Sequence, residues 1–135
     1  MTASNVIYTF GYGNRSNYND LQKYFADYNI NCLVDVRLKP YGWSKIWCAE
    51  YLDYFCKQQK VDYLSLKALG NTSGNVQWMP PDIVQAKEAI FAVKEKLEQG
   101  SVVLMCSEKD YRRCHRTAVA DSVVELVSCP VVHLS

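Results

Sequence analysis

The residues best suited to chemistry lie close together between residues 102 and 116. A short apolar run ends at Cys106, and Glu108 follows two positions later. The triplet Cys114, His115 and Arg116 begins eight positions after the first cysteine. A deprotonated thiol is a nucleophile, imidazole and carboxylate groups transfer protons, and guanidinium binds anions. Because α/β proteins place their sites where a strand passes into a helix, this pattern predicts a functional site around Cys106.

Two interpretations of this cluster stay open. A thiol at a strand end, facing a helix N-terminus and several arginines, is stabilised as a thiolate, and His115 or Glu108 would then transfer protons. Alternatively, Cys106 is a small buried hydrophobic residue, and His115 only hydrogen-bonds a loop carbonyl. In the second case the cluster is purely structural and closes the loop with hydrogen bonds.

Two further patterns at this junction are weaker. Cys106 and Arg112 have the Cys-x5-Arg spacing of the tyrosine phosphatase phosphate loop, but the segment has no glycine and its carboxylates repel anions. Residue types that bind zinc occur at Cys106, Glu108, Cys114, His115 and His133. However, neighbouring Cys114 and His115 on a predicted helix point about 100° apart and rarely bind one ion together. We therefore predict no cofactor and no metal, with a zinc-dependent hydrolase as an alternative.

Apolar runs and helical periodicities alternate along the chain. Strands are predicted at residues 6–10, 32–37, 61–66, 102–106 and 130–134. Helices are predicted at residues 17–28 and 46–60, between Pro81 and Gly100, and after Asp110, which is a good N-cap. This order predicts a single α/β domain over residues 1–135, a three-layer α/β/α fold with a mostly parallel sheet of about five strands.

Helical spacing also predicts which helical residues are buried. In the second helix these are Trp47, Tyr51, Tyr54 and Phe55. In the third helix the apolar stripe consists of Ile83, Ala86, Ile90, Val93 and Leu97.

The loops at the carboxyl ends of parallel strands gather at one edge of the sheet. Here those loops are residues 11–16, 37–44, 69–75 and 107–110, and the site should lie among them. Arg37 at a strand end suits bidentate binding of phosphate or carboxylate, together with Arg15 and Arg116. Aromatic residues in the same loops, such as Tyr12, are able to stack on a nucleobase. Asp35 lies on the same face of its strand as Arg37 and is expected to form an ion pair with it.

The composition excludes several classes of protein. Hydrophobic residues make up 49% of the chain, which is too many for a disordered protein. A net charge of +1 gives no general attraction to nucleic acid or to a membrane. Residues 1–5 lack the features of a signal peptide, and no apolar run approaches the ~20 residues that span a bilayer. We therefore predict a cytoplasmic protein whose six cysteines are reduced.

Several segments in order resemble the DUF488 family, a set of small α/β domains without an assigned function. They are residues 9–16, 33–37, 40–45 and 69–71, the pair Cys-x-Glu and Cys-His-Arg at 106–116, and residues 132–134. The resemblance implies the fold and the location of the site but supplies no reaction. Family members often carry histidine where this chain has Tyr12, so any chemistry of that histidine is absent here.

We predict a Cys/His-dependent enzyme that acts on a small anionic or nucleotide-like ligand at the carboxyl edge of the sheet. The predicted catalytic residues are Cys106, Glu108 and His115. The predicted ligand-binding residues are Tyr12, Arg15, Arg37, Asn71, Cys114 and Arg116. The alternatives are a non-catalytic module that binds a nucleotide or nucleic acid and the zinc-dependent hydrolase. No membrane partner is expected, and the sequence does not predict the oligomeric state.

Overall fold

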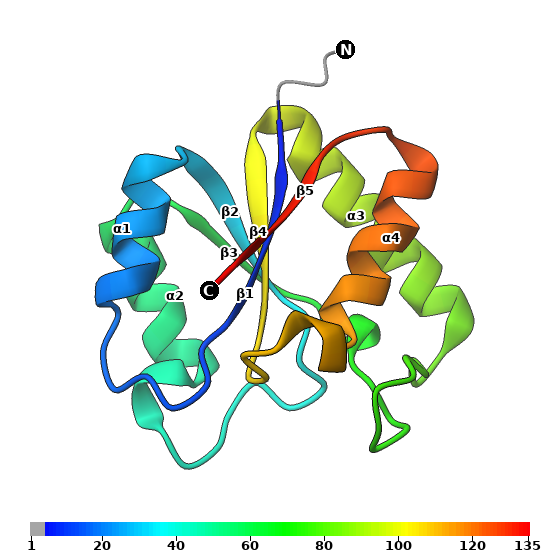
Figure 1. The fold of residues 1–135 in the computed structure, drawn as a ribbon, viewed down its shortest axis with the longest axis horizontal. Coiled ribbons are helices and arrows are strands. Elements are labelled where there is room, and N and C mark those ends of the chain that lie inside the picture. The colour runs from blue at the N-terminus through cyan, green and yellow to red at the C-terminus, as the bar shows by residue number, and fades with distance from the viewer. Residues whose placement is uncertain (1–4) are drawn as a thin grey trace.

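The computed structural model describes residues 5–135 and contains one five-stranded sheet in the order β3-β2-β4-β1-β5 (Figure 1). Every neighbouring pair of strands is parallel. The strands are β1 (Ile7–Gly11), β2 (Ile30–Asp35), β3 (Asp62–Ser65), β4 (Ser101–Cys106) and β5 (Val131–Leu134). The predicted mostly parallel α/β sheet is therefore confirmed.

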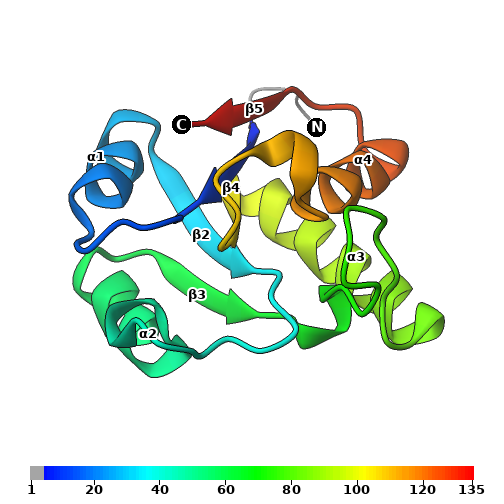
Figure 2. The ribbon, with the colours of Figure 1, turned by 60° about the horizontal axis from the view of Figure 1, so that its bottom comes forward.

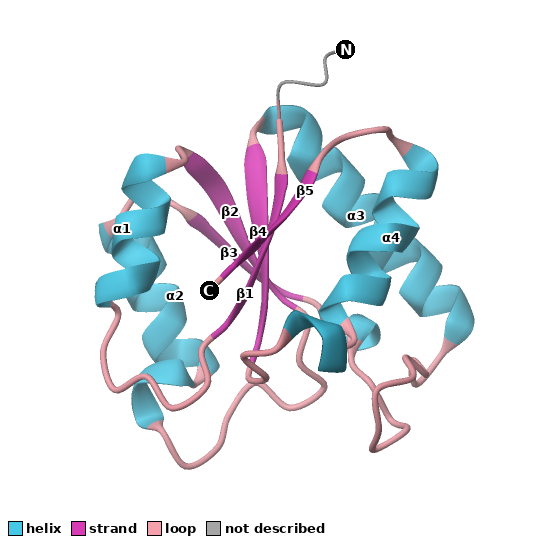
Figure 3. Ribbon diagram, in the orientation of Figure 1, coloured by secondary structure: helices cyan, strands magenta, loops and turns pink. Residues whose placement is uncertain are grey.

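Four α-helices connect the strands: α1 (Asn19–Asp27), α2 (Ala49–Gln58), α3 (Ile83–Gln99) and α4 (Arg116–Leu126). Three short 3-10 helices lie in the connections: η1 (Lys45–Trp47), η2 (Lys67–Leu69) and η3 (Tyr111–Arg113). Helices α1 and α2 cover one face of the sheet, and α3 and α4 cover the other (Figure 3). The fold is thus the three-layer α/β/α arrangement that the alternating pattern predicts.

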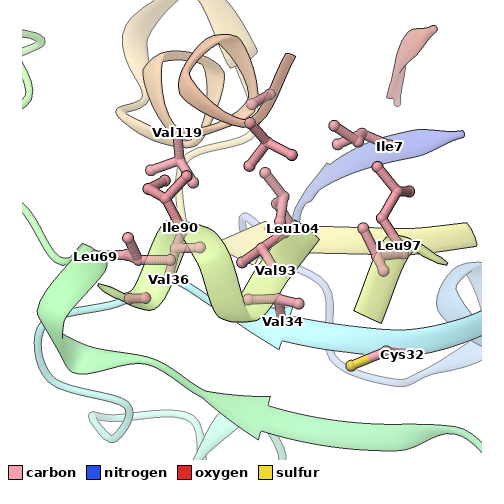
Figure 4. Close-up of a cluster of buried hydrophobic side chains, with 14 of the residues drawn as sticks. Ile7, Cys32, Val34, Val36, Leu69, Ile90, Val93, Leu97, Leu104 and Val119 are labelled. Carbon is pink, nitrogen blue, oxygen red and sulfur yellow. The ribbon is translucent and has the colours of Figure 1, made fainter. Parts of the chain in front are cut away.

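The core lies on both faces of the sheet because parallel strands are buried on both sides. All six residues of β4 are buried, and the five from Val102 to Cys106 alternate between the two clusters. Leu104 packs with Val34 and Val93 beneath α3 (Figure 4). Val103 and Met105 belong to the opposite cluster beneath α1 and α2. Cys106 is the last β4 residue on the α3–α4 side, so the core itself fixes where its sulfur points.

The predicted buried face of the second helix is partly wrong. Trp47 and Phe55 are buried as expected, but Tyr51 is 45% exposed and Tyr54 is 66% exposed. The buried α2 residues are instead Leu52, Phe55 and Cys56. The helix turns these three residues toward the sheet and leaves the two tyrosines at the surface. In α3, Ile83 at the first turn is likewise exposed, whereas the rest of its predicted stripe is buried.

The start of the fourth helix also differs from the expectation. The Asp110 side chain accepts a hydrogen bond from the Arg112 backbone N–H and caps η3 rather than α4. Cys114 then takes an extended conformation, and α4 begins only at Arg116, with His115 at its N-cap. The chain between β4 and α4 is therefore longer and more folded than a single helix start allows.

No helix in residues 5–135 is both long and apolar enough to cross a membrane.

Candidate functional site

The loops after β1, β2 and β4 begin side by side at the carboxyl edge of the sheet, which Figure 2 brings forward. Gly11, at the end of β1, lies opposite Cys106, at the end of β4. The Tyr12 N–H donates to the Cys106 carbonyl at 3.1 Å, and the Val36 N–H donates to the Met105 carbonyl at 3.1 Å. The chains after β1 and β2 lead to helices on one face, whereas the chain after β4 leads to α4 on the other face. Such a divergence between neighbouring strands opens a crevice in parallel sheets.

A cavity of about 330 Å³ lies at this divergence. Seven of the predicted site residues line it: Tyr12, Arg37, Asn71, Cys106, Glu108, Cys114 and His115. Its other lining residues are Leu38, Lys39, Tyr41, Asn75, Ser107 and Arg113. The edge of the sheet thus gathers side chains from four separate loops around one space.

Cys106 and Cys114 form a disulfide, with their Cα atoms 7.6 Å apart. The prediction of reduced cysteines is therefore wrong for this pair, although the other four described cysteines are free. The prediction of reduced cysteines relied on the composition and the expected cytoplasmic location, neither of which describes the backbone before α4. The extended backbone at Cys114 turns its sulfur toward Cys106.

Arg116 lies beneath the cavity rather than in its wall. Its side chain is fully buried, and one Nη donates to the Cys106 sulfur at 3.1 Å and to the Glu108 carbonyl. The other Nη donates to the Lys109 carbonyl at 3.2 Å. Burial lowers the pKa of Arg116 to about 10, so the group still carries its charge at neutral pH. Within residues 5–135 its guanidinium forms no salt bridge with a carboxylate.

His115 is oriented by backbone groups, of which the Val36 carbonyl makes the short hydrogen bond. Its Nε2 lies 2.8 Å from the Val36 carbonyl, which only accepts hydrogen bonds, so Nε2 carries the proton. The other ring nitrogen, Nδ1, is then an acceptor and lies 3.9 Å from the Cys114 sulfur. Burial lowers the pKa of His115, so the ring is neutral at pH 7 and is able to accept a proton. His115 therefore faces Cys114 rather than Cys106.

Arg37 is held in place by a buried ion pair. Its Nε and one Nη donate to the two Asp35 carboxylate oxygens at 2.8 and 2.6 Å. The Tyr63 hydroxyl also donates to Asp35 at 2.6 Å, and the second Nη of Arg37 lies 3.3 Å from the Tyr12 hydroxyl. Burial lowers the pKa of Arg37, but the hydrogen bond and charge of Asp35 outweigh it and raise the pKa overall. The expected Asp35–Arg37 pair is thus present, and it directs the guanidinium toward the cavity.

Arg15 does not line the cavity, although it was a predicted ligand-binding residue. It donates to the Gly11 and Tyr12 carbonyls and to Asp20, and it lies over the Phe10 ring. Its contacts hold the turn after β1 in shape. Arg15 therefore contacts the turn after β1 rather than the cavity.

Other candidates from the sequence lie elsewhere. Arg112 is exposed and pairs with Asp110, so its guanidinium does not return to Cys106 as a phosphatase loop requires. His133 contacts Thr9 at 2.6 Å and stacks on Tyr111, away from the cavity lining. In residues 5–135 no group of three or more His, Cys, Asp or Glu side chains is arranged to hold a metal ion.

Two cationic lining residues were not singled out as site residues from the sequence. Lys39 follows Arg37 in the loop after β2, and Arg113 ends η3. The sequence offered one signal for each: Lys39 lies shortly after a predicted strand end, and Arg113 lies between Cys106 and Cys114. With Arg37 they place three cations around the cavity, against one lining carboxylate, Glu108.

Fold and site together define a small parallel α/β domain with a cysteine pair at the carboxyl edge of its sheet. The chain belongs to the family described as "Domain of unknown function DUF488", whose model matches residues 18–123. The match includes both cysteines, Glu108, His115 and Arg116, whereas Tyr12 and Arg15 lie outside it. No curated protein and no solved structure matches the chain.

Proposed function

We propose that the cavity binds a small anionic ligand and that Cys106, once reduced, attacks it as a nucleophile. The observation that carries this proposal is the buried Arg116 guanidinium, which lies 3.1 Å from the Cys106 sulfur and forms no salt bridge with a carboxylate among the described residues. Glu108 and Asp110 act on this charge only from beyond salt-bridge distance, and a buried charge without a directly paired anion is costly. A Cys106 thiolate in contact with the guanidinium would compensate it. The arrangement therefore favours the reactive form of this thiol.

The anionic character of the ligand is supported by the charges in the cavity wall. Arg37, Lys39 and Arg113 line it, and Asp35 holds the Arg37 fork rigid in advance of binding. A pre-organised guanidinium binds a carboxylate or phosphate with little further loss of side-chain freedom.

A nucleobase has less support than an anion. One face of the Tyr12 ring is stacked on Trp47 at 4.7 Å, and Arg37 lies over the ring at 5.5 Å from its centre. Tyr41 is exposed and lines the cavity, so it is the aromatic residue available for stacking.

Proton transfer in this proposal falls to His115 and Glu108. The free Nδ1 of His115 faces Cys114, so it would take the proton of that thiol. Glu108 lines the cavity, where its carboxylate would accept or return a proton on the ligand. Its Oε2 already accepts from the Asp110 N–H at 3.1 Å, which limits its movement.

Alkylation with two reagents of different charge tests both halves of the proposal. Reduced protein would be treated with anionic iodoacetate and with neutral iodoacetamide, and the modified cysteines would be located by mass spectrometry. We expect Cys106 to react selectively, with a larger preference for iodoacetate than a free cysteine shows. Labelling of Cys106 as slow as that of fully buried Cys32 would contradict the proposal.

Two adjacent arginines provide a matched pair for this experiment. Arg113→Ala removes a lining cation, whereas Arg112→Ala removes an exposed neighbour outside the lining. We expect Arg113→Ala to lower the iodoacetate preference about two- to fivefold, since one charge a few ångströms away contributes about 1 kcal/mol or less in water. Arg112→Ala should leave it unchanged.

The second candidate is a non-catalytic anion-binding module. The buried Asp35–Arg37 pair favours it, because Arg37 held in this way would bind an anion without any reaction of the Cys106 thiol. Titration calorimetry with a nucleoside monophosphate separates the two. Binding that is equal in wild-type protein and Cys106→Ser, but lost in Arg37→Lys, together with slow Cys106 alkylation, would establish the binding module.

A further inference from the structure

The sulfurs of Cys106 and Cys114, which both line the cavity, have different environments. A reaction with one nucleophile would use only the first of them. Cys106 ends β4 and contacts the Arg116 guanidinium. Cys114 lies in the extended link between η3 and α4, and its sulfur faces Nδ1 of His115. A cation beside one sulfur and a neutral base beside the other give the two thiols separate roles.

The two cysteines come together only through this particular backbone path. They are eight residues apart in the chain, and the bond between them closes the loop after β4. Opening the bond therefore releases a covalent constraint on the segment between them. That segment carries Glu108 and Arg113, which both line the cavity.

We propose that Cys106 and Cys114 are a thiol–disulfide exchange pair whose substrates are anionic disulfides of low molecular weight. This inference rests on the proposed function, because it uses the same cavity and the same Cys106 nucleophile. It adds the class of substrate and a second reacting sulfur.

The reaction has two steps. The Cys106 thiolate attacks one sulfur of R–S–S–R, so a Cys106–S bond forms, the substrate S–S bond breaks and RS⁻ leaves with a proton from solvent. Cys114 then passes its proton to Nδ1 of His115 and attacks the Cys106 sulfur. The internal disulfide forms, and the second RS⁻ leaves with the proton from His115. Two electrons pass from the dithiol to the substrate, which becomes two thiols.

The charges of the site select the substrate and the attacking sulfur. Arg116 stabilises the thiolate of Cys106, which makes it the entering nucleophile, and Cys114 resolves the mixed disulfide. The lining cations Arg37, Lys39 and Arg113 favour carboxylates on the R groups. The reverse reaction with two molecules of the thiol RSH restores the dithiol.

Three disulfides of different charge test this assignment on the reduced full chain: anionic oxidised glutathione, neutral bis(2-hydroxyethyl) disulfide and cationic cystamine. Each rate is divided by the rate of the same disulfide with N-acetylcysteine. We expect oxidised glutathione to react about tenfold faster than cystamine on this scale, since charge complementarity raises encounter rates by that order. Wild-type protein should end as the internal disulfide, without a bound glutathionyl group.

Two serine variants identify the role of each sulfur. Cys114→Ser should stop at a stable mixed disulfide of glutathione with Cys106. Cys106→Ser should react at least about tenfold more slowly than wild-type protein, because the remaining Cys114 thiol lacks the Arg116 contact. Wild-type protein that accumulates the mixed disulfide, or that reacts equally with all three reagents, would overturn the inference. If Cys106 still reacts selectively with iodoacetate in that case, the proposed function stands alone. If iodoacetate selectivity is absent as well, both fail.

Discussion

Arg116 contacts both the proposed nucleophile and the loop that follows it. Its guanidinium bonds the Glu108 and Lys109 carbonyls as well as the Cys106 sulfur, and all of it is buried. We expect Arg116→Leu to lower the free energy of unfolding by about 2–3 kcal/mol, because it leaves two carbonyls without their charged donor. Urea denaturation measures this, and Arg112→Leu is the control, with an expected change within about 0.5 kcal/mol. Equal effects of the two variants would contradict the role given to Arg116.

Asp35 is the second residue on which the site depends, since it holds Arg37 with both oxygens while being fully buried. We expect Asp35→Asn to lower the free energy of unfolding by about 3 kcal/mol, because it leaves the Arg37 charge buried and unpaired. It should also weaken anion binding in the cavity. The matched control is Asp53→Asn, which loses only an exposed i,i+4 contact with Lys57 and should cost less than about 0.5 kcal/mol.

At the scale of elements, the tip of β1 must approach the loop after β4 more closely than any side chain permits. A Cβ on Gly11 would lie 1.8 Å from the Glu108 carbonyl oxygen, a backbone atom that cannot rotate away. We expect Gly11→Ala to destabilise the protein by about 2–3 kcal/mol and to displace the loop that carries Glu108. Thermal unfolding would measure the loss of stability. Gly42→Ala is the control, because its Cβ would meet no atom within 4 Å.

The strands could be predicted from the sequence, whereas helix boundaries and faces could not be predicted reliably. The apolar run at 102–106 is buried on both faces and matches β4 closely. Asp110 signals a helix start, but a 3-10 turn and an α-helix both need an acceptor for their first N–H groups, so the residue does not distinguish them. Apolar and aromatic residues occur on both sides of α2, so helical spacing fits more than one buried face, and Tyr51 and Tyr54, which were predicted to be buried, are exposed.

The gathering of most candidate residues around one cavity was predictable for the same reason as the sheet. Parallel strands bring their carboxyl ends to one edge, so the sequence alone predicts that Tyr12, Arg37, Asn71 and the cluster around Cys106 lie together. The disulfide was not predictable, because it depends on the extended backbone of Cys114, which no residue pattern announces. Arg15 and Arg116 also lie outside the cavity lining, because their guanidinium groups donate to backbone carbonyls. The sequence does not reveal where those carbonyls lie.

The whole molecule has two histidines, and folding affects both in the same direction. Burial lowers the pKa of His115 and of His133, so the folded state binds protons less readily than the unfolded chain. Between the lowered folded values and the unfolded value of about 6.5, the unfolded state holds more protons, and stability rises with pH. We expect the free energy of unfolding to fall as pH decreases from 7 through this window. His133→Gln, measured by urea denaturation across pH, should flatten the profile, and an unchanged slope would contradict this origin.

The central claim is that the sheet edge presents Cys106 as a thiolate stabilised by a buried guanidinium. The most direct test is the pH dependence of the rate at which iodoacetamide alkylates Cys106 in reduced Cys114→Ser protein. We expect a midpoint clearly below about 8.5, the value of a free thiol, with partly exposed Cys48 as the internal reference. A midpoint for Cys106 at or above that of Cys48 would contradict the account.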